Sequence, residues 1–131
     1  MKTLVVEDDF ISRTILKKIL SPYGACDTVV NGKEAVDAFS IAYAEGAPYD
    51  LICLDIMMPE MDGREALKLI RQKEKDKKVQ PKDEAKIIMI TALDTPKEVI
   101  DAYYKGECSA YIVKPIQKQK ILENIKDMGL I

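Results

Sequence analysis

The chain has 131 residues, of which 47% are hydrophobic and 32% are charged, and its formal net charge is −2. This length and composition are typical of one globular domain with a substantial core, so we expect a single domain over residues 1–131. The slightly acidic balance argues against direct nucleic-acid binding, and the absence of histidine excludes a Ser–His or Cys–His nucleophile pair and a histidine zinc ligand.

Nothing in the sequence predicts membrane insertion or an oxidising compartment. No apolar run approaches the roughly 18 residues that predict a transmembrane helix, and the first residues form no signal-peptide-like stretch. The cysteines Cys26, Cys53 and Cys108 are odd in number and form no C-x-x-C pair, so we expect them to be reduced and in or near the core. Together these features predict a cytoplasmic protein.

The first predicted elements are a strand and a helix separated by acids. Residues 3–6 form a largely β-branched run that predicts a strand, and the three acids of residues 7–9 follow it directly. Helical spacing then predicts the first helix from Ile11, Ile15, Leu16, Ile19 and Leu20.

The second strand and helix are predicted from residues 25–45. Residues 25–30 favour a strand, which Asp27 weakens and therefore places at a sheet edge. Asn31 resembles an N-cap with Glu34 three residues on. The helix that follows carries the apolar stripe Ala35, Val36, Phe39 and Tyr43.

The third strand is the most informative stretch of the chain. Four apolar residues, 51–54, run straight into Asp55, which indicates a strand buried on both faces. Pro59 forbids the strand from continuing, and Asp62-Gly63 predicts a turn before a third helix from Arg64 to about Lys75. Asp55 is therefore expected at the carboxyl end of a central strand, where open α/β sheets carry their sites.

The second half of the chain continues the alternation. Residues 71–86 are rich in charge and are interpreted as an exposed helix end and surface loop. Residues 87–90 predict a buried strand that ends at Thr91, and a capping box at 95–98 begins a fourth helix that ends at Gly106. Residues 110–113 predict the fifth strand. The last helix is striped by Ile121, Leu122, Ile125 and Met128.

Five short strands that alternate with five helices predict a three-layer α/β fold with a parallel sheet. The strand ends then bring Glu7, Asp8, Asp55, Thr91 and Lys114 to one edge. Crowded carboxylates repel unless a cation lies among them, and carboxylate oxygens are ligands that Mg²⁺ prefers. With a lysine and a hydroxyl beside them, they suit phosphoryl transfer with Asp55 as the nucleophile.

Four segments at these strand ends resemble the receiver domain of bacterial two-component response regulators. They are Val-Val-Glu-Asp, Asp-Ile-Met-Met-Pro-Glu-Met-Asp-Gly, Thr-Ala and Tyr-Ile-Val-Lys-Pro, at residues 5–8, 55–63, 91–92 and 111–115. The resemblance covers the whole chain and is specific because all segments occur in order. It implies a flavodoxin-like doubly wound sheet of order 2-1-3-4-5, in a stand-alone receiver without an effector domain. It implies a signalling switch, not an enzyme beyond its own phosphoryl transfer and dephosphorylation.

The resemblance also implies a role for each site residue. Asp55 matches the phosphoacceptor, Asp8 a direct Mg²⁺ ligand, and Glu7 an acid that acts mainly through water. The backbone carbonyl of Met57 would complete the protein ligands, and Lys114 would pair with the phosphoryl oxygens.

The remaining implied features concern the switch and its partners. Thr91 and the amide of Ala92 would bind the phosphoryl group, Tyr111 would follow Thr91 inward, and a cis bond would precede Pro115. The phosphoryl group would come from a sensor histidine kinase or a histidine phosphotransfer protein. A separate downstream protein would bind the face formed by the fourth helix, fifth strand and fifth helix.

Some assignments stay open at the level of the sequence. Because Asp9 makes three adjacent acids, the ligand pair could be Asp8 and Asp9, although we expect Asp9 to cap the first helix. Thr91 could be a turn residue at a strand end, and Tyr111 could be half-buried packing.

Three other functions are consistent with parts of the pattern. An aspartyl-phosphate phosphatase resembles D-x-D, but Met57 occupies the place of its second aspartate. A flavin or nucleotide binder would need a Gly/Ser/Thr-rich loop after the first strand, where residues 7–9 would repel phosphate. A receiver-like module that signals without phosphorylation is the main alternative.

Overall fold

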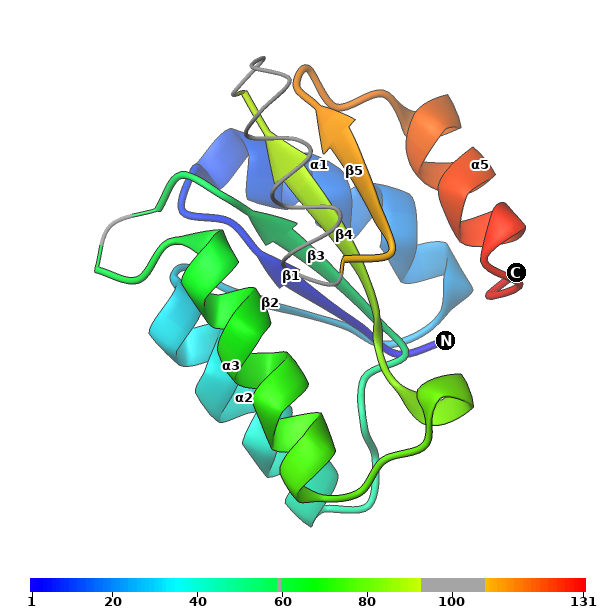
Figure 1. Ribbon diagram of the computed structural model, residues 1–131. Coiled ribbons are helices and arrows are strands. Elements are labelled where there is room, and N and C mark those ends of the chain that lie inside the picture. Colours follow the sequence, from blue (N-terminus) through cyan, green and yellow to red (C-terminus); the bar gives the residue numbers. More distant parts are fainter. Residues whose placement is uncertain (59, 93–107) are drawn as a thin grey trace.

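The computed structural model describes residues 1–58, 60–92 and 108–131, and these form a parallel sheet with helices on both faces (Figure 1). The sheet order is β2-β1-β3-β4-β5, and every adjacent pair is parallel. The strands are β1 (Thr3–Val6), β2 (Cys26–Val29), β3 (Leu51–Asp55), β4 (Lys86–Thr91) and β5 (Ala110–Val113). The predicted α/β class, strand order and edge position of the second strand are confirmed.

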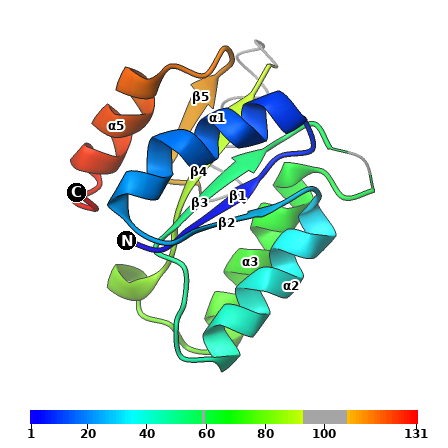
Figure 2. The ribbon, with the colours of Figure 1, turned by 180° about the vertical axis from the view of Figure 1, so that it is seen from behind.

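Within residues 1–58, 60–92 and 108–131, two helices cover each face of this sheet. On one face lie α2 (Gly32–Ala44) and α3 (Gly63–Asp76); on the other lie α1 (Phe10–Leu20) and α5 (Lys118–Asp127) (Figures 1 and 2). Short 3-10 turns occupy Ser21–Tyr23 and Pro81–Asp83. The fourth helix predicted at 95–106 lies outside the described residues. Among the helices that are described, none has the length and apolar character needed to cross a bilayer.

Side-chain caps fix where three of the helices begin. Asp9 accepts from the Ser12 amide at 2.9 Å, so it is the N-cap of α1, as predicted. Asn31 caps α2 by accepting from the Glu34 amide, and Glu34 accepts from the amide of Val30 in return. Asp62 caps α3. Each cap satisfies amides that have no partner within the helix, and each follows a loop that leaves the sheet.

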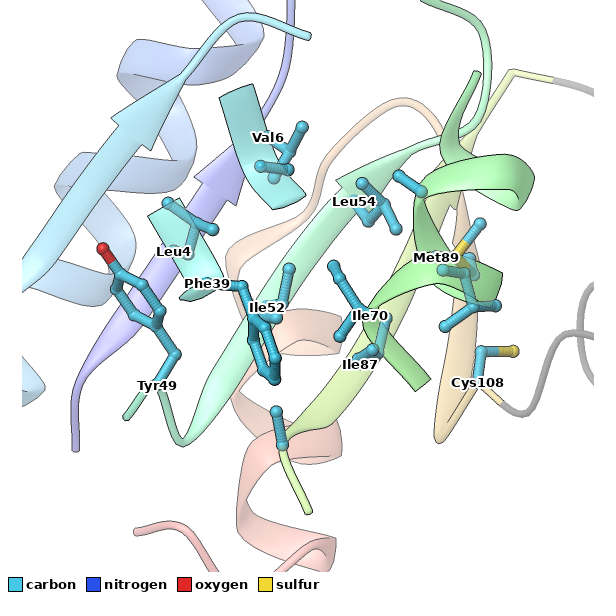
Figure 3. Close-up of a cluster of buried hydrophobic side chains, with 14 of the residues drawn as sticks. Leu4, Val6, Phe39, Tyr49, Ile52, Leu54, Ile70, Ile87, Met89 and Cys108 are labelled. Atoms are coloured by element: carbon cyan, nitrogen blue, oxygen red, sulfur yellow. The ribbon is translucent and has the colours of Figure 1, made fainter. Parts of the chain in front are cut away.

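The sheet separates two apolar clusters. One packs α2 and α3 against the sheet, with Phe39, Ile52 and Ile70 fully buried (Figure 3). The other packs α1 and α5 against the opposite face, around Leu16 and Ile121. All five residues of β3 are buried, as the continuous apolar run predicted. The cysteines are free, two of them buried and Cys26 partly so.

The first helix departs from the predicted apolar pattern. Its buried residues are Leu16, Ile19 and Leu20, whereas Ile11 is 67% exposed and Ile15 is 40% exposed. Spacing alone groups all five residues because 3.6-residue periodicity describes a broad stripe, and it does not show how much of that stripe the sheet covers.

The prediction that residues 71–86 are solvated is wrong for two charged residues. Arg71 is 7% exposed and Glu74 is fully buried. The Arg71 Nη1 atom donates to Glu74 Oε1 at 2.7 Å and to the Ala85 carbonyl at 2.8 Å, while the Ala85 amide donates to Glu74 Oε2 at 2.8 Å. This network ties the last turns of α3 to the start of β4. The two ions tolerate burial because each is paired and hydrogen-bonded.

Candidate functional site

Three carboxylates converge at the carboxyl edge of the sheet. Val6 of β1 pairs with Leu54 of β3, so the next residues along, Glu7 and Asp55, are neighbours on central strands. One oxygen from each of Glu7, Asp8 and Asp55 lies within 4.8 Å of the others. Glu7 is 1% exposed and Asp55 is 4% exposed, whereas Asp8 is open to solvent.

A lysine at the end of the edge strand β5 contacts two of these carboxylates. Lys114 follows β5, and its amide donates to the Thr91 carbonyl at 2.7 Å, which holds it against the end of β4. Its Nζ atom lies 2.5 Å from Glu7 Oε1 and 3.7 Å from Asp55 Oδ2. The peptide bond between Lys114 and Pro115 is cis, as predicted.

Burial dominates the electrostatics of Asp55. It raises the pKa of this carboxyl to about 8, assisted by the nearby Glu7 carboxylate and opposed by Lys114. Burial lowers the pKa of Lys114, but its contacts with the carboxylates of Glu7 and Asp55 outweigh that effect, so its pKa is raised overall. The site therefore holds more negative charge than one ammonium group can neutralise.

An orphaned oxygen indicates what completes the site. Glu7 Oε2 is buried and has no hydrogen-bond partner, although Glu7 Oε1 is bound to Lys114. Buried carboxylate oxygens almost always have a partner because desolvation is costly. A hard divalent cation among Glu7, Asp8 and Asp55 would supply one, and an all-oxygen donor set suits Mg²⁺. The residues present therefore fit this ion.

The other predicted site residues lie around the same edge. Thr91 ends β4 and is 1% exposed, and Ala92 follows it on the surface. The amide of Met57 donates to Asp55 Oδ1 at 3.4 Å, and its side chain is 57% exposed. Tyr111 lies on β5, two residues before the partner of Thr91, and is 41% exposed. Asp9 turns away to cap α1, so the acids beside Asp55 are Glu7 and Asp8.

Comparison with known proteins agrees with this geometry. A family model described as the response regulator receiver domain matches residues 3–126. The chain belongs to the response regulator receiver domain family. A chemotaxis protein CheY of Listeria monocytogenes is 38% identical over 128 residues, which cover 96% of each chain. As a receiver, the chain is a phosphorylation-dependent signalling switch and not a conventional enzyme.

Two similar solved structures are complexes with ligands or partner proteins. The CheX–CheY–BeF3–Mg²⁺ complex of Borrelia burgdorferi matches with a TM-score of 0.83 and 30% identity, covering 98% of this chain and 89% of that one. The Saccharomyces cerevisiae complex of the phosphotransfer protein Ypd1 with the receiver of Ssk1 matches with a TM-score of 0.82 and 28% identity. That match covers 98% of the present receiver and 88% of the other chain.

The structure adds two residues that the sequence pattern did not single out for the site. Arg13 of α1 donates to the carbonyls of Glu7 and Asp8, and Gly63 packs directly on the backbone of Asp55. Arg13 lies among apolar residues at helical spacing, where an arginine is normally a solvated residue. Gly63 was interpreted as a turn residue only, since close approach to a strand leaves no local signal.

The stability of the metal-free receiver should fall as pH rises. Because folding raises the pKa of Asp55 to about 8 from 3.8, its contribution is fully favourable below about pH 4 and is lost between about pH 4 and pH 8. Replacing Asp55 with asparagine should therefore stabilise the metal-free receiver at pH 8, by about 2–5 kcal/mol. Urea unfolding in EDTA at pH 5 and pH 8 measures this.

Magnesium and pH provide the controls. The difference between Asp55→Asn and the unaltered receiver should shrink at pH 5, where Asp55 is protonated in the fold. Added Mg²⁺ should stabilise the unaltered receiver more than the variant, because binding to the native state adds to stability by mass action. An Asp55→Asn receiver no more stable than the unaltered one at pH 8 in EDTA would contradict the prediction.

Proposed function

We propose that this receiver accepts a phosphoryl group on Asp55, with Mg²⁺ held by Glu7, Asp8, Asp55 and the Met57 carbonyl. The observation that supports it most is the convergence of three carboxylates within 4.8 Å, one with an orphaned buried oxygen, beside an ammonium group that reaches two of them. A purely structural cluster would not be expected to keep so much unneutralised charge at the edge of a central strand.

The chain's own residues would supply nucleophile and orientation. An Asp55 carboxylate oxygen attacks the phosphorus of a phosphohistidine on the donor protein; the new P–O bond forms as the P–N bond breaks, and the leaving imidazole takes a proton from solvent. Lys114 pairs with the phosphoryl oxygens, and the hydroxyl of Thr91 and amide of Ala92 donate to them. The bound Mg²⁺ supplies positive charge where charge develops on the transferring group.

The phosphoryl group would then bias two pre-existing states. It adds roughly −1.5 to −2 charges and three acceptor oxygens at one point. A population shift from 1:99 to 99:1 needs about 5.5 kcal/mol of differential binding. New contacts of the phosphoryl oxygens with Thr91 and Lys114 would supply that difference. Before phosphorylation the Lys114 ammonium contacts the carboxylates of Glu7 and Asp55, and the phosphoryl group would add a further negative partner. Tyr111, exposed in this state, would move inward with Thr91.

The partners follow from this chemistry. The donor is a sensor histidine kinase or a histidine phosphotransfer protein, the class that the matched Ssk1 receiver accompanies in its complex. The recipient of the signal is a separate protein that binds the face of the fourth helix, β5 and α5. Direct nucleic-acid binding and membrane insertion form no part of the proposal, and the receiver would act in the cytoplasm.

Intact mass spectrometry after incubation with acetyl phosphate tests this function. We expect one phosphoryl adduct that requires Mg²⁺, is lost in EDTA and is absent from Asp55→Asn. Asp37→Asn is the matched control, since Asp37 is an exposed carboxylate on α2. It should label like the unaltered receiver.

Two outcomes would count against the proposal. Labelling that persists in Asp55→Asn would place the acceptor elsewhere. Absence of any adduct, despite demonstrable Mg²⁺ binding, would favour the phosphorylation-independent interaction module.

A further inference from the structure

We infer that Arg13 is a positioning residue, which holds the loop after β1 so that Glu7 and Asp8 are already directed at the Mg²⁺ site. The Arg13 Nη1 atom donates to the carbonyl of Glu7 at 2.9 Å and to the carbonyl of Asp8 at 3.3 Å. Both of these acceptors are backbone carbonyls and not side-chain carboxylates. Its action is on the backbone that carries them.

Two consecutive carbonyls determine the direction of the side chain between them. Each trans peptide is planar, so fixing the carbonyl of Glu7 and the carbonyl of Asp8 fixes the two peptide planes on either side of the Asp8 Cα atom. Those planes set φ and ψ of Asp8, and with them the direction of its Cα–Cβ bond. Asp8 is the exposed member of the acidic cluster, so the sheet core does not orient its carboxylate.

The rest of the loop is attached at both ends. The Glu7 amide donates to the Val29 carbonyl of β2 at 3.1 Å, which extends the ladder by one bond. Two residues on, Asp9 caps α1 through the Ser12 amide. Arg13 therefore fixes the segment between these two anchors. Without it, repulsion among the carboxylates of Glu7, Asp8 and Asp55 could rotate the loop peptides and move Glu7 and Asp8 away from Asp55.

The position of Arg13 is itself supported. It lies in the first turn of α1, its guanidinium carbon is 5.6 Å from the ring centroid of Phe10, and it is only partly exposed. Phe10 is 69% exposed and contributes nothing to either apolar cluster, so cover for the guanidinium group is a physical reason for an aromatic residue there. Phe10 and the two carbonyls therefore both contact the Arg13 guanidinium group.

Charge and position make opposite predictions for Arg13. If its positive charge merely adds to the field near the site, removing it should strengthen Mg²⁺ binding. If Arg13 orients the acids, removing it should weaken binding, because the ion must then bear the cost of ordering the loop. Residues that orient metal ligands typically contribute about 10- to 100-fold in affinity. The inference rests on the proposed Mg²⁺ site.

Isothermal titration of Mg²⁺ into the receiver, Arg13→Gln, Arg13→Lys and Lys17→Gln separates these accounts. Lys17 is an exposed cation one turn further along α1, so Lys17→Gln removes the same charge from the same helix without touching the loop. We expect about tenfold weaker binding in Arg13→Gln, a smaller loss in Arg13→Lys, and unchanged or slightly tighter binding in Lys17→Gln.

A second readout distinguishes positioning from general damage. The Mg²⁺ concentration that gives half-maximal acetyl phosphate labelling should rise in Arg13→Gln, while the labelling rate at saturating Mg²⁺ approaches that of the unaltered receiver. Binding in Arg13→Gln as tight as in Lys17→Gln would overturn the inference, and if Arg13→Gln does not fold, the same comparison applies to Arg13→Lys. No Mg²⁺ binding by the unaltered receiver would instead overturn the proposed function.

Discussion

Replacing Gly63 with alanine is expected to damage both the stability of the receiver and its affinity for Mg²⁺. A Cβ atom at Gly63 would lie 2.2 Å from the Asp55 carbonyl oxygen and 2.9 Å from both the Asp55 carbonyl carbon and the Ile56 Cα atom. All three are backbone atoms, so no side chain can rotate to make room. The start of α3 must move away from the end of β3.

The size of the effect follows from what this movement breaks. The Gly63 amide donates to the Ile56 carbonyl at 2.9 Å, which closes the loop that leaves the sheet after Asp55. Forcing a methyl group into such a packed contact typically costs about 1–3 kcal/mol. The backbone of Asp55 moves with it, and a displacement of its carboxylate should weaken Mg²⁺ binding by about tenfold. Urea unfolding and calorimetric titration measure the two effects.

Gly46→Ala provides the matched control. Gly46 has a φ of 74°, so alanine there is strained, but its Cβ atom would meet nothing within 4 Å. It should cost about 1 kcal/mol of stability and leave Mg²⁺ affinity unchanged. Gly63→Ala with the Mg²⁺ affinity of Gly46→Ala would show that the contact does not position Asp55.

Replacing Glu74 with alanine is expected to cost about 3–5 kcal/mol of the free energy of unfolding. Glu74 is fully buried and accepts from both Arg71 and the Ala85 amide. Its removal takes the Glu74 carboxylate away from the buried Arg71 guanidinium near the carboxyl end of α3, and it removes the acceptor of the buried Ala85 amide. Urea unfolding at neutral pH measures the loss.

Two variants calibrate this result. Glu74→Gln keeps an acceptor but removes the charge, so its loss should lie between those of the unaltered receiver and Glu74→Ala. Gln72→Ala removes an exposed hydrogen bond to Asp76 from the same helix and should cost less than about 0.5 kcal/mol. The prediction fails if Glu74→Ala is no more destabilising than Gln72→Ala.

Much of the site could be predicted from the sequence because parallel strands end at one edge. Asp55, Thr91 and Lys114 each follow an apolar run, and the resulting strands pair in parallel with their ends together. Their convergence needed only the alternation of strands and helices, which short continuous apolar runs and apolar residues at helical spacing reveal locally. The fourth predicted helix lies outside the described residues and stays a prediction.

The sequence by itself determined the class of fold, the strand ends and the Asp9 and Asn31 caps, because these depend on residues near one another in the chain. Only the tertiary structure decided which acids face Asp55: the bond from Glu7 to Val29 keeps Glu7 in register while Asp9 turns to cap α1. Likewise, Arg71 and Glu74 carry no local sign of burial, since their burial depends on the peptide of Ala85, which the fold brings to them. Burial and orientation of charge are set by distant partners, and local pattern cannot report them.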